Sequence, residues 1–565
     1  MRLDKIKIGS AKKSPGHHFK NLKDVTIDFD QDHWVTVVIG WNGTGKSNVL
    51  EALAIIFRDL IMQKKTPGFA FVLQYRMGGG ENALHIEIDA DPERAKEPFV
   101  IHVASDPEAR GVGTLTPFIE GEPKTSARRG KQITLNAFLK DDEKHLPRYV
   151  FSYYSGESSR MHEVFRPYLE RYDKELRGGK DPGLKRLFYT LPVHSQFVLL
   201  AFLIQKSEDV RTFLLDHLGI DPDEGIESVL FVLMQPPWSK NKAVPYSDGD
   251  SRFWNARGVV SEFLNRLYDI ALAPVESSRK EPVSLWNDKT LLFKYLYVKD
   301  VDALRRLVGS QPPAQFFRDL ESTHVSQLID EVRIRIRLKQ NDGTVTFREL
   351  SEGEQQLLTV IGLLRFTSES ESLFLLDEPD THINPRWCVD YLNYLQKFSG
   401  QDAGVRQSSH IVLTTHNPLA IAELVKEQVQ ILFRDPKSMA VMVENPAVDP
   451  KGMGFSGIIT SDMFGLGSSL DNATNDDLIK LHRLSTKPDL TPQERDEMVK
   501  LRERLKQLDF NFAARDRLEQ EYLRARFDLA TDENLDGAVV TPENKQRALD
   551  ALVQSLLKDL GEGQK

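Results

Sequence analysis

The chain has 565 residues, of which 40% are hydrophobic and 28% are charged, and its formal net charge at pH 7 is −9. These values are typical of a globular protein with two or three domains, and the negative charge excludes a uniformly basic coat for nucleic acid. No apolar run reaches the roughly 18 residues of a membrane span, and the charged N-terminus lacks the apolar stretch of a secretory signal. The single cysteine, Cys388, excludes an internal disulfide and a zinc site of the CxxC type. We therefore expect a cytoplasmic protein.

The first part of the chain predicts strands around one helix. An apolar run suited to a buried strand precedes a glycine-rich turn, and residues 47–62 then follow with the apolar spacing of a helix. The stretch from about 91 to 145 is rich in Pro, Gly and charge and predicts an irregular insertion with a basic tip, TSARRGK. The expected strands are 1–8, 22–29, 35–39, 69–77, 82–90 and 146–156.

Residues 158–329 predict a mostly helical insertion, because apolar residues recur there at helical spacing between long polar interruptions. No heptad pattern lasts for three or four repeats, so a long coiled-coil arm is not expected. Two alternating runs then flank Asn341-Asp342-Gly343, which is a strong signal for a β-hairpin. Beyond the hairpin, helical and apolar strand patterns alternate up to about residue 417, as in a parallel sheet covered by helices.

These patterns predict an α/β fold in which a mixed sheet flanked by helices forms one nucleotide-binding domain, split by the helical insertion. The N-terminal lobe is expected at 1–157, the insertion at 158–329 and the C-terminal lobe at 330–470. The charged remainder, 471–565, predicts a helical C-terminal region.

A complete phosphate-loop motif, GxxxxGKS, occupies Gly40 to Ser47 between the buried strand and the helix. Its glycines allow backbone N–H groups to turn inward around phosphate oxygens, and the following helix directs its positive end to the same anion. Lys46 is expected to reach the β- and γ-phosphates of ATP, and Ser47 to supply an oxygen to Mg²⁺. The expected ATP-binding residues of this loop are Gly40, Asn42, Gly43, Thr44, Gly45, Lys46, Ser47 and Asn48.

Two carboxylates, Asp377 and Glu378, end the apolar strand LFLL. Asp377 is expected to bind Mg²⁺ directly or through water. Glu378 is placed to polarise the attacking water as a general base. An acidic strand end that caps a helix is the alternative, and the phosphate loop in the same chain argues against it.

The segment Leu350 to Gln356, LSEGEQQ, lies between the hairpin and an apolar helix. Taken alone, Ser351 and Glu354 form a helix capping box. The position shortly before the Asp-Glu strand makes the segment resemble the ABC signature, usually LSGGQ, whose serine and helix N-terminus bind the γ-phosphate held by a second protomer. Ser351 and Gly353 match that pattern, whereas Glu352 and Glu354 depart from it. The resemblance implies an ABC-type P-loop domain that acts as a dimer.

Three further residues are assigned by position. His416 follows the strand HIVL, where ABC enzymes place a switch histidine that contacts the γ-phosphate, and its imidazole can report the loss of phosphate. Asp380 and His382 occupy the position of the D-loop, which crosses the dimer interface. Gln74 fits either a glutamine that bridges to Mg²⁺ or an exposed strand residue, so it is left out of the expected site.

The stretches NGTGKSN, FKNLKDVTIDF and DEPDTHINP resemble the SMC-like branch of ABC ATPases, which includes RecF, the OLD proteins and ATPases of bacterial anti-phage systems. The later segment SGIITSDMFGLGSSLDNATNDDL is similar to the region after the core in PtuA ATPases of Septu systems, including those found beside retrons. This resemblance implies that the chain is an ATP-dependent sensor that gates a nuclease. The cleavage of nucleic acid is then performed by a separate HNH nuclease, PtuB. Retron versions add a reverse transcriptase and its RNA–DNA product.

Nuclease activity in this chain is not expected. OLD proteins carry a metal-dependent nuclease domain that needs Glu and Asp-x-Asp carboxylates, and no Asp-x-Asp follows His416. One alternative function is a RecF-like DNA-repair or DNA-maintenance ATPase, for which the tip TSARRGK and the strand RIRIRLK are the local basic features. A transporter motor is the other alternative, and the insertion of about 300 residues between phosphate loop and Asp-Glu strand argues against it.

Overall fold

The structure is a computed structural model, in which the chain forms two compact units, Met1–Gly465 and Leu466–Lys565. No helix in the described ranges is both long enough and apolar enough to cross a membrane. The structure describes residues 1–508 except 13–14, 31, 80–82, 106–129, 157–158, 206, 224, 241–248, 285–286, 339–343, 368–370, 399–408, 467 and 486–489.

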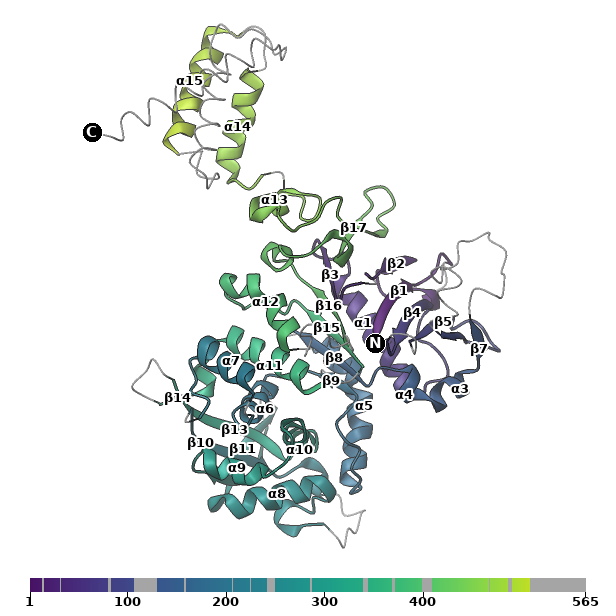
Figure 1. The fold of residues 1–565 in the computed structure, drawn as a ribbon, viewed down its shortest axis with the longest axis vertical. Coiled ribbons are helices and arrows are strands. Elements are labelled where there is room, and N and C mark those ends of the chain that lie inside the picture. Colours follow the sequence, from purple (N-terminus) through teal and green to yellow (C-terminus); the bar gives the residue numbers. More distant parts are fainter. Residues whose placement is uncertain are drawn as a thin grey trace, which may run out of the picture. The chain divides into compact units, whose positions relative to one another are not determined.

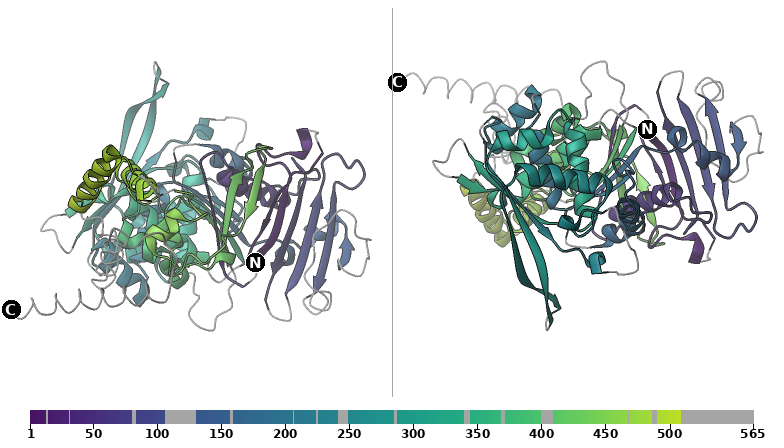
Figure 2. Two further views of the ribbon diagram at one scale, coloured as in Figure 1. Left: turned by 90° about the horizontal axis from the view of Figure 1, so that it is seen from above. Right: turned by 90° about the horizontal axis from the view of Figure 1, so that it is seen from below.

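An antiparallel sheet in the order β2-β1-β4-β5-β6-β7 forms the N-terminal lobe (purple to blue in Figures 1 and 2). Most of its strands place buried apolar residues on one face, and many of the residues between them are only half-buried. The strands are β1 Arg2–Ile8, β2 Val25–Asp28, β4 Phe71–Met77, β5 Leu84–Ala90, β6 Phe99–Ser105 and β7 Lys131–Ile133.

The prediction of an irregular insertion over about 91–145 is wrong for its described part. The run FVIHVAS forms β6, which pairs with β5 along its whole length, and the short helices α3 (Leu135–Lys140) and α4 (Asp142–His145) follow β7. This run has the apolar content of a strand, but the charged, Pro- and Gly-rich sequence on both sides favoured the prediction of an irregular segment. Most of the basic tip, residues 125–129, lies outside the described residues.

The central sheet contains seven strands in the order β18-β17-β3-β16-β15-β8-β9, and all are parallel except β18. This sheet confirms the expected α/β class. Its strands are β3 Val35–Gly40, β8 Tyr149–Tyr154, β9 Leu187–Tyr189, β15 Ser372–Asp377, β16 Ser409–Thr414, β17 Val429–Arg434 and β18 Val441–Glu444.

Both faces of the central sheet are buried, which explains why its strands are continuously apolar. One face, which includes Val38 and Leu375, packs on helix α1 (Lys46–Ile61) and the N-terminal sheet. The opposite face, which includes Ile39 and Phe374, belongs to a second core shared with the insertion and with helices α11 (Glu352–Thr367) and α12 (Pro385–Phe398). The insertion therefore extends the core of the nucleotide-binding domain.

The insertion contains the expected helices, together with strands that the sequence did not predict. Strand β10 and the long hairpin β11–β12 join β13 and β14 in a five-stranded sheet of order β11-β12-β10-β13-β14, and the hairpin projects from it in Figure 2. The strands are β10 Ile226–Met234, β11 Leu272–Ser284, β12 Asn287–Val298, β13 Ile329–Arg337 and β14 Thr344–Thr346. The helices are α5 Arg160–Arg177, α6 Val193–Phe202, α7 Glu208–Leu218, α8 Gly258–Ile270, α9 Val301–Val308 and α10 Pro313–Val325.

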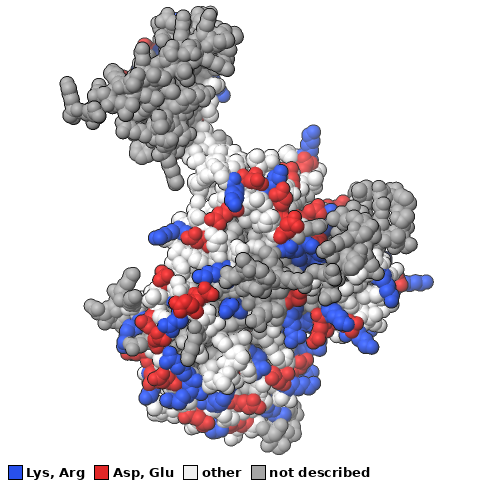
Figure 3. Space-filling view, in the orientation of Figure 1, with Lys and Arg blue, Asp and Glu red and all other residues white. Residues whose placement is uncertain are grey.

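The predicted hairpin around 341–343 is confirmed by the antiparallel pairing of β13 with β14, although those three residues lie outside the described ones. In β13 the isoleucines of RIRIR are buried and the arginines are exposed. Over the face shown in Figure 3, cationic and anionic side chains are interspersed, without a large region of one sign. This distribution fits the exclusion of a uniformly basic coat.

The described part of the C-terminal unit contains two helices. A helical pair, α14 (Asn472–Ser485) and α15 (Pro492–Gln507), buries a small cluster of leucines. Helix α15 begins at a capping box formed by Thr491 and Glu494. The preceding helix α13, Gly454–Thr460, belongs to the first unit.

Candidate functional site

The predicted motifs meet at one edge of the central sheet. Strands β3, β16 and β15 are parallel neighbours, so their carboxyl ends lie side by side, and Thr414 is in register with both Val38 and Asp377. The phosphate loop follows β3, and Asp377 and His416 lie at the ends of the other two strands. Ligands of open α/β sheets bind at this edge.

Backbone carbonyl groups of the phosphate loop accept hydrogen bonds from Lys46, a residue of the same loop. The Lys46 ammonium donates to the carbonyl oxygens of Gly40, at 2.8 Å, and Trp41, at 3.4 Å. Its burial lowers the pKa of Lys46, and the nearby Glu378 and Asp377 oppose that shift. Asn42 and Gly43 are exposed at the tip of the loop, whereas Thr44 is buried. At Gly40 a Cβ would lie 2.2 Å from the Leu432 carbonyl oxygen, which explains the glycine there.

Two residues outside the motif, Asn21 and Arg434, contact the phosphate loop, and neither was predicted from the sequence as a site residue. The Asn21 amide donates to the carbonyl oxygen of Thr44 at 3.1 Å and accepts from the Asn48 amide at 2.6 Å. Arg434, at the end of β17, donates to the Gly43 carbonyl at 2.7 Å. Asn21 lies in the stretch FKNLK, which carried the family resemblance but had no role assigned.

Asp377 is buried beside the phosphate loop. Its Oδ1 accepts from the hydroxyls of Ser47, at 3.0 Å, and Thr414, at 2.5 Å, whereas its Oδ2 is buried without a hydrogen-bond partner among the described residues. Burial raises the pKa of Asp377, and the two hydroxyl bonds oppose the rise. An unpaired carboxylate oxygen next to a serine hydroxyl fits Mg²⁺, which takes few protein ligands and keeps its waters.

Glu378 and His416 form a pair at the entrance to this edge. The Nε2 of His416 donates to Glu378 Oε1 at 3.0 Å, and both side chains are partly exposed. This hydrogen bond lowers the pKa of Glu378, burial opposes it, and the charges of His416 and Lys46 add to the lowering. The backbone of Glu378 has φ 52°, a strained value for a residue that is not glycine. Its N–H is held by the Thr414 hydroxyl at 3.1 Å.

Arg160 is a third residue that the sequence analysis missed. It begins helix α5, and its guanidinium contacts Asn48 Oδ1 at 3.4 Å and Glu51 Oε2 at 3.1 Å. Glu51 is buried and also pairs with Lys20. The charge of Arg160 acts to lower the pKa of Asp377. The arginine therefore lies beside the first turn of the phosphate-loop helix.

The Ser351 segment adopts the capping box that its sequence alone predicts. The Ser351 hydroxyl and N–H both donate to Glu354, at 2.8 and 2.7 Å, at the exposed start of α11. The next glycine is needed for a close approach, because a Cβ on Gly353 would lie 2.3 Å from the His382 carbonyl oxygen. His382 also lies 3.5 Å from Glu352. The signature segment and the D-loop thus pack together within one chain.

Replacing Gly353 by Ala is expected to destabilise the fold by about 1–3 kcal/mol, because the new methyl group meets backbone atoms that have no room to move. The free energy of unfolding in urea measures the effect. Gly68→Ala is the matched control, since a Cβ on Gly68 meets nothing within 4 Å. Equal stability of the two variants would contradict this account of the contact.

Asp380 of the D-loop is buried and accepts a hydrogen bond from the Thr415 hydroxyl at 2.7 Å. Its burial raises its pKa to about 6. Gln74 fits neither of the two interpretations given for it, because its side chain is buried and contacts Glu87 in place of a site residue. It is 4% exposed on β4 and donates to Glu87 at 2.8 Å.

The raised pKa of Asp380 predicts a pH-dependent stability. The folded state holds the proton up to about pH 6, whereas the unfolded chain loses it near pH 4, so this residue stabilises the fold at low pH and the contribution is lost as pH rises through 6. Asp380→Asn is therefore expected to gain up to about 3 kcal/mol over the wild type between pH 4 and 7. Thermal unfolding of both proteins across this range tests it, with exposed Asp288→Asn as control. A difference that does not vary with pH would contradict the prediction.

Two family profiles match the chain. The family described as "AAA domain, putative AbiEii toxin, Type IV TA system" matches residues 247–422, and the family described as "AAA ATPase domain" matches residues 17–104. These ranges include the phosphate loop and the Asp377, Glu378 and His416 motifs.

One similar protein is the Septu protein PtuA of Bacillus mycoides (strain KBAB4), with 25% identity over 137 residues. The matched stretch is 24% of this chain and only 18% of that protein. With the two profiles, it confirms the expected resemblance to PtuA and to ATPases.

Solved SMC head domains are also similar. One is the SMC head domain from Thermotoga maritima, and the other is the Smc head domain with an extended coiled coil bound to the C-terminal domain of ScpA derived from Pyrococcus furiosus. Each is 12% identical, with a TM-score of 0.31, and the match covers 79% of this chain and 100% or 96% of theirs. The fold assignment rests on the strand order and on the position of the phosphate loop.

Proposed function

We propose that this chain is an ATPase that binds ATP with Mg²⁺ at the carboxyl edge of its central sheet. The observation that carries the proposal is the meeting of four elements at this edge: the phosphate loop, the Ser47–Asp377 contact, the Glu378–His416 pair and Arg160. The two ATPase profiles support the same reading.

Each residue has a distinct task in this proposal. The backbone N–H groups of the phosphate loop and the Lys46 ammonium bind the phosphates, so Lys46 exchanges its carbonyl contacts for phosphate oxygens. Ser47 and the unpaired oxygen of Asp377 would hold Mg²⁺, which neutralises charge on the phosphates when bound. Glu378 takes a proton from the attacking water. His416 keeps that carboxylate ionised and oriented, because its hydrogen bond favours the charged form.

We further propose that two copies face each other to complete the site. The exposed N-terminus of α11, with Ser351, offers a positive helix end to a phosphate held by the second copy. Glu354 now holds the Ser351 hydroxyl, so the serine has to leave Glu354 to bind phosphate. The contact of Gly353 with the D-loop would transmit this movement to Asp380.

The output is proposed to be control of a separate nuclease of the HNH type in a cytoplasmic anti-phage complex. The similarity to PtuA supports this part, over the quarter of the chain that it covers. Within the described residues after His416, the strands are only the pair β17–β18, and the sequence there contains no Asp-x-Asp. The destructive chemistry is therefore assigned to a partner.

Purification of the tagged chain from its own host tests the proposal. We expect an HNH protein to co-purify and phage plating to fall only when both proteins are present and Lys46 is intact. A chain that always purifies alone and leaves phage plating unchanged would overturn the assignment. ATP-dependent, salt-sensitive binding of duplex DNA by the chain alone would instead support a DNA-maintenance ATPase.

A further inference from the structure

A cavity of about 490 Å³ lies in the insertion, between helices α5 and α10 and the strands β9 and β13. It belongs to the size class of small-molecule sites. Its walls include the apolar side chains of Leu169, Leu191, Met234 and Val325. None of the predicted nucleotide-site residues lines it.

Lys185, Glu321 and His324 line one part of the cavity, which we call the floor, and the first two belong to a buried network that also contains His194. Glu321 accepts from the Lys185 ammonium on one oxygen and from His194 Nε2, at 2.6 Å, on the other. All three side chains are at most 2% exposed. His194 Nδ1 accepts from the Leu191 N–H at 2.7 Å, so its proton is on Nε2 and the imidazole is neutral. The ion pair of Lys185 and Glu321 is therefore a full pair of charges removed from water.

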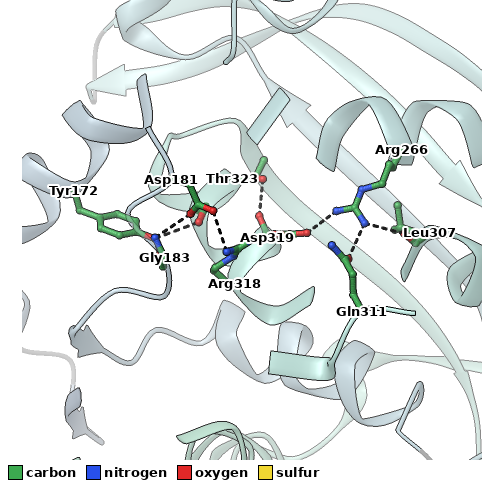
Figure 4. A network of polar contacts seen from close by, with 10 residues as sticks. Tyr172, Asp181, Gly183, Arg266, Leu307, Gln311, Arg318, Asp319 and Thr323 are labelled. Carbon is green, nitrogen blue, oxygen red and sulfur yellow. Dashed lines mark hydrogen bonds and ion pairs between the residues drawn. The ribbon is translucent and has the colours of Figure 1, made fainter. Parts of the chain in front are cut away.

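Helix α10 has other buried polar contacts besides this network. A second network anchors the same helix through Asp319, which accepts from Arg266 at 2.5 Å and from Arg318 at 3.1 Å (Figure 4). Arg318 also reaches Asp181, at 3.2 Å. A buried ion pair costs so much desolvation that apolar replacements are often as stable or more stable. Because Lys185 and Glu321 both line the cavity, this costly ion pair points to a role in binding a ligand there.

The floor keeps hydrogen-bonding capacity for a ligand. Of the three N–H groups of Lys185, one serves Glu321, and the ammonium also lies 4.6 Å from the Phe188 ring centre. Among the described residues, the imidazole of His324 on the cavity wall makes ring contacts with His194 and Phe197 but no hydrogen bond or ion pair. Burial lowers the pKa of His324 to about 4. At neutral pH it is an uncharged donor and acceptor. Lys185 and His324 together suit a carboxylate or phosphate group.

The exposed rim of the cavity, formed by Glu163, Arg166 and Glu170, has a net negative charge. Arg166 is the only cation between Glu163, at 3.3 Å, and Glu170, at 3.0 Å, so this exposed group carries one net negative charge. Asp173 and Asp330 lie on the same lining, but each is paired with an arginine, Asp173 with Arg177 at 2.8 Å and Asp330 with Arg279 at 3.4 Å, so they add no net charge. A rim with excess carboxylate repels polyanions such as nucleic acid and attracts a cation.

We infer that this cavity binds a small zwitterion, with its carboxylate or phosphate on Lys185 and His324 and its ammonium at the Glu163–Glu170 rim. The chemical class is that of amino acids and amino-phosphates. The site is separate from the nucleotide site and adds a second ligand to the chain.

Isothermal titration of the full chain without ATP or Mg²⁺ tests the inference. The probes are the twenty amino acids, O-phosphoserine and phosphoethanolamine, and the last two distinguish a phosphate from a carboxylate. We expect saturable binding of at least one probe at micromolar to millimolar concentration. The N-acetylated form of that probe, which lacks the ammonium, is expected to bind at least tenfold more weakly. No binding by any probe, or equal binding of the acetylated form, would overturn the inference.

Three variants locate the site. Val325→Trp places a large ring in the cavity while Lys185 and Glu321 are both kept, and it is expected to abolish binding, whereas His324→Leu should weaken it at least tenfold. The double change Glu163→Gln with Glu170→Gln should weaken the zwitterion about threefold to tenfold and leave the acetylated probe unchanged. Glu175→Gln, on the same helix but outside the lining, is the matched control. Unchanged binding in Val325→Trp would overturn the assignment. Lys46→Ala is expected to keep this binding, which separates the cavity from the nucleotide site.

Discussion

Replacing Glu378 by Gln is expected to lower the turnover number for ATP by a factor of about 100 to 10,000 while ATP binding is kept. Gln retains an oxygen that accepts from His416, so the local geometry is preserved and only the base is lost. In the proposed dimer, ATP that is not hydrolysed is expected to keep the two chains together for longer. Phosphate release measures turnover, and light scattering with ATP should show accumulated dimers.

The matched control for this variant is Glu427→Gln, an exposed carboxylate that belongs to none of the motifs. It is expected to hydrolyse ATP like the wild type and to form no lasting dimers. Unchanged hydrolysis in Glu378→Gln would overturn the role of Glu378 as the base. Lost ATP binding in that variant would point instead to a structural role for the strained turn at φ 52°.

Replacing Lys46 by Ala is expected to weaken ATP binding about 10- to 100-fold, the equivalent of one or two charge-assisted hydrogen bonds. The ammonium is nearly buried and already directed at the carbonyl oxygens of the phosphate loop, so it is placed to bind phosphate with little rearrangement. Binding of a fluorescent ATP analogue measures the loss. Turnover is expected to fall in parallel at low ATP concentration.

Lys65→Ala, an exposed lysine just after α1, controls for the loss of one positive charge. The two variants also separate the steps of the reaction, since Lys46→Ala acts on binding and Glu378→Gln acts on chemistry. Unchanged ATP affinity in Lys46→Ala would contradict the assignment of the loop to ATP.

The sequence predicted the parts of the site that are contiguous along the chain. The phosphate loop, the Asp377-Glu378 strand end and His416 each follow an apolar strand, and parallel pairing then brings the three ends together. Asn21, Arg160 and Arg434 belong to no local motif, and each reaches the site from a different segment. Only the folded chain shows that they contact the loop.

The strands that escaped prediction did so for different reasons. The described side chains of β11 are exposed or half-buried, so the strand has no alternating apolar pattern. Strand β10 is a mostly buried apolar run, which periodicity alone does not distinguish from a helix segment. At Gly353 the sequence suggested nucleotide contact, but the reason for a glycine there is the approach of the His382 backbone, which lies 29 positions later. At Glu378 no residue type signals a positive φ.

Helix α5 touches both places that are proposed to bind a ligand. Its first residue, Arg160, contacts Asn48 in the phosphate-loop helix, and later turns line the cavity as far as Asp173. Pro167 lies within the part of the helix that lines the cavity, and it has no N–H to give to the Glu163 carbonyl, so the helix is most easily bent at this level. If bending of this shared helix changes both places, the two binding equilibria are coupled. The factor by which ATP changes the affinity of the cavity must then equal the factor by which the cavity ligand changes the affinity for ATP.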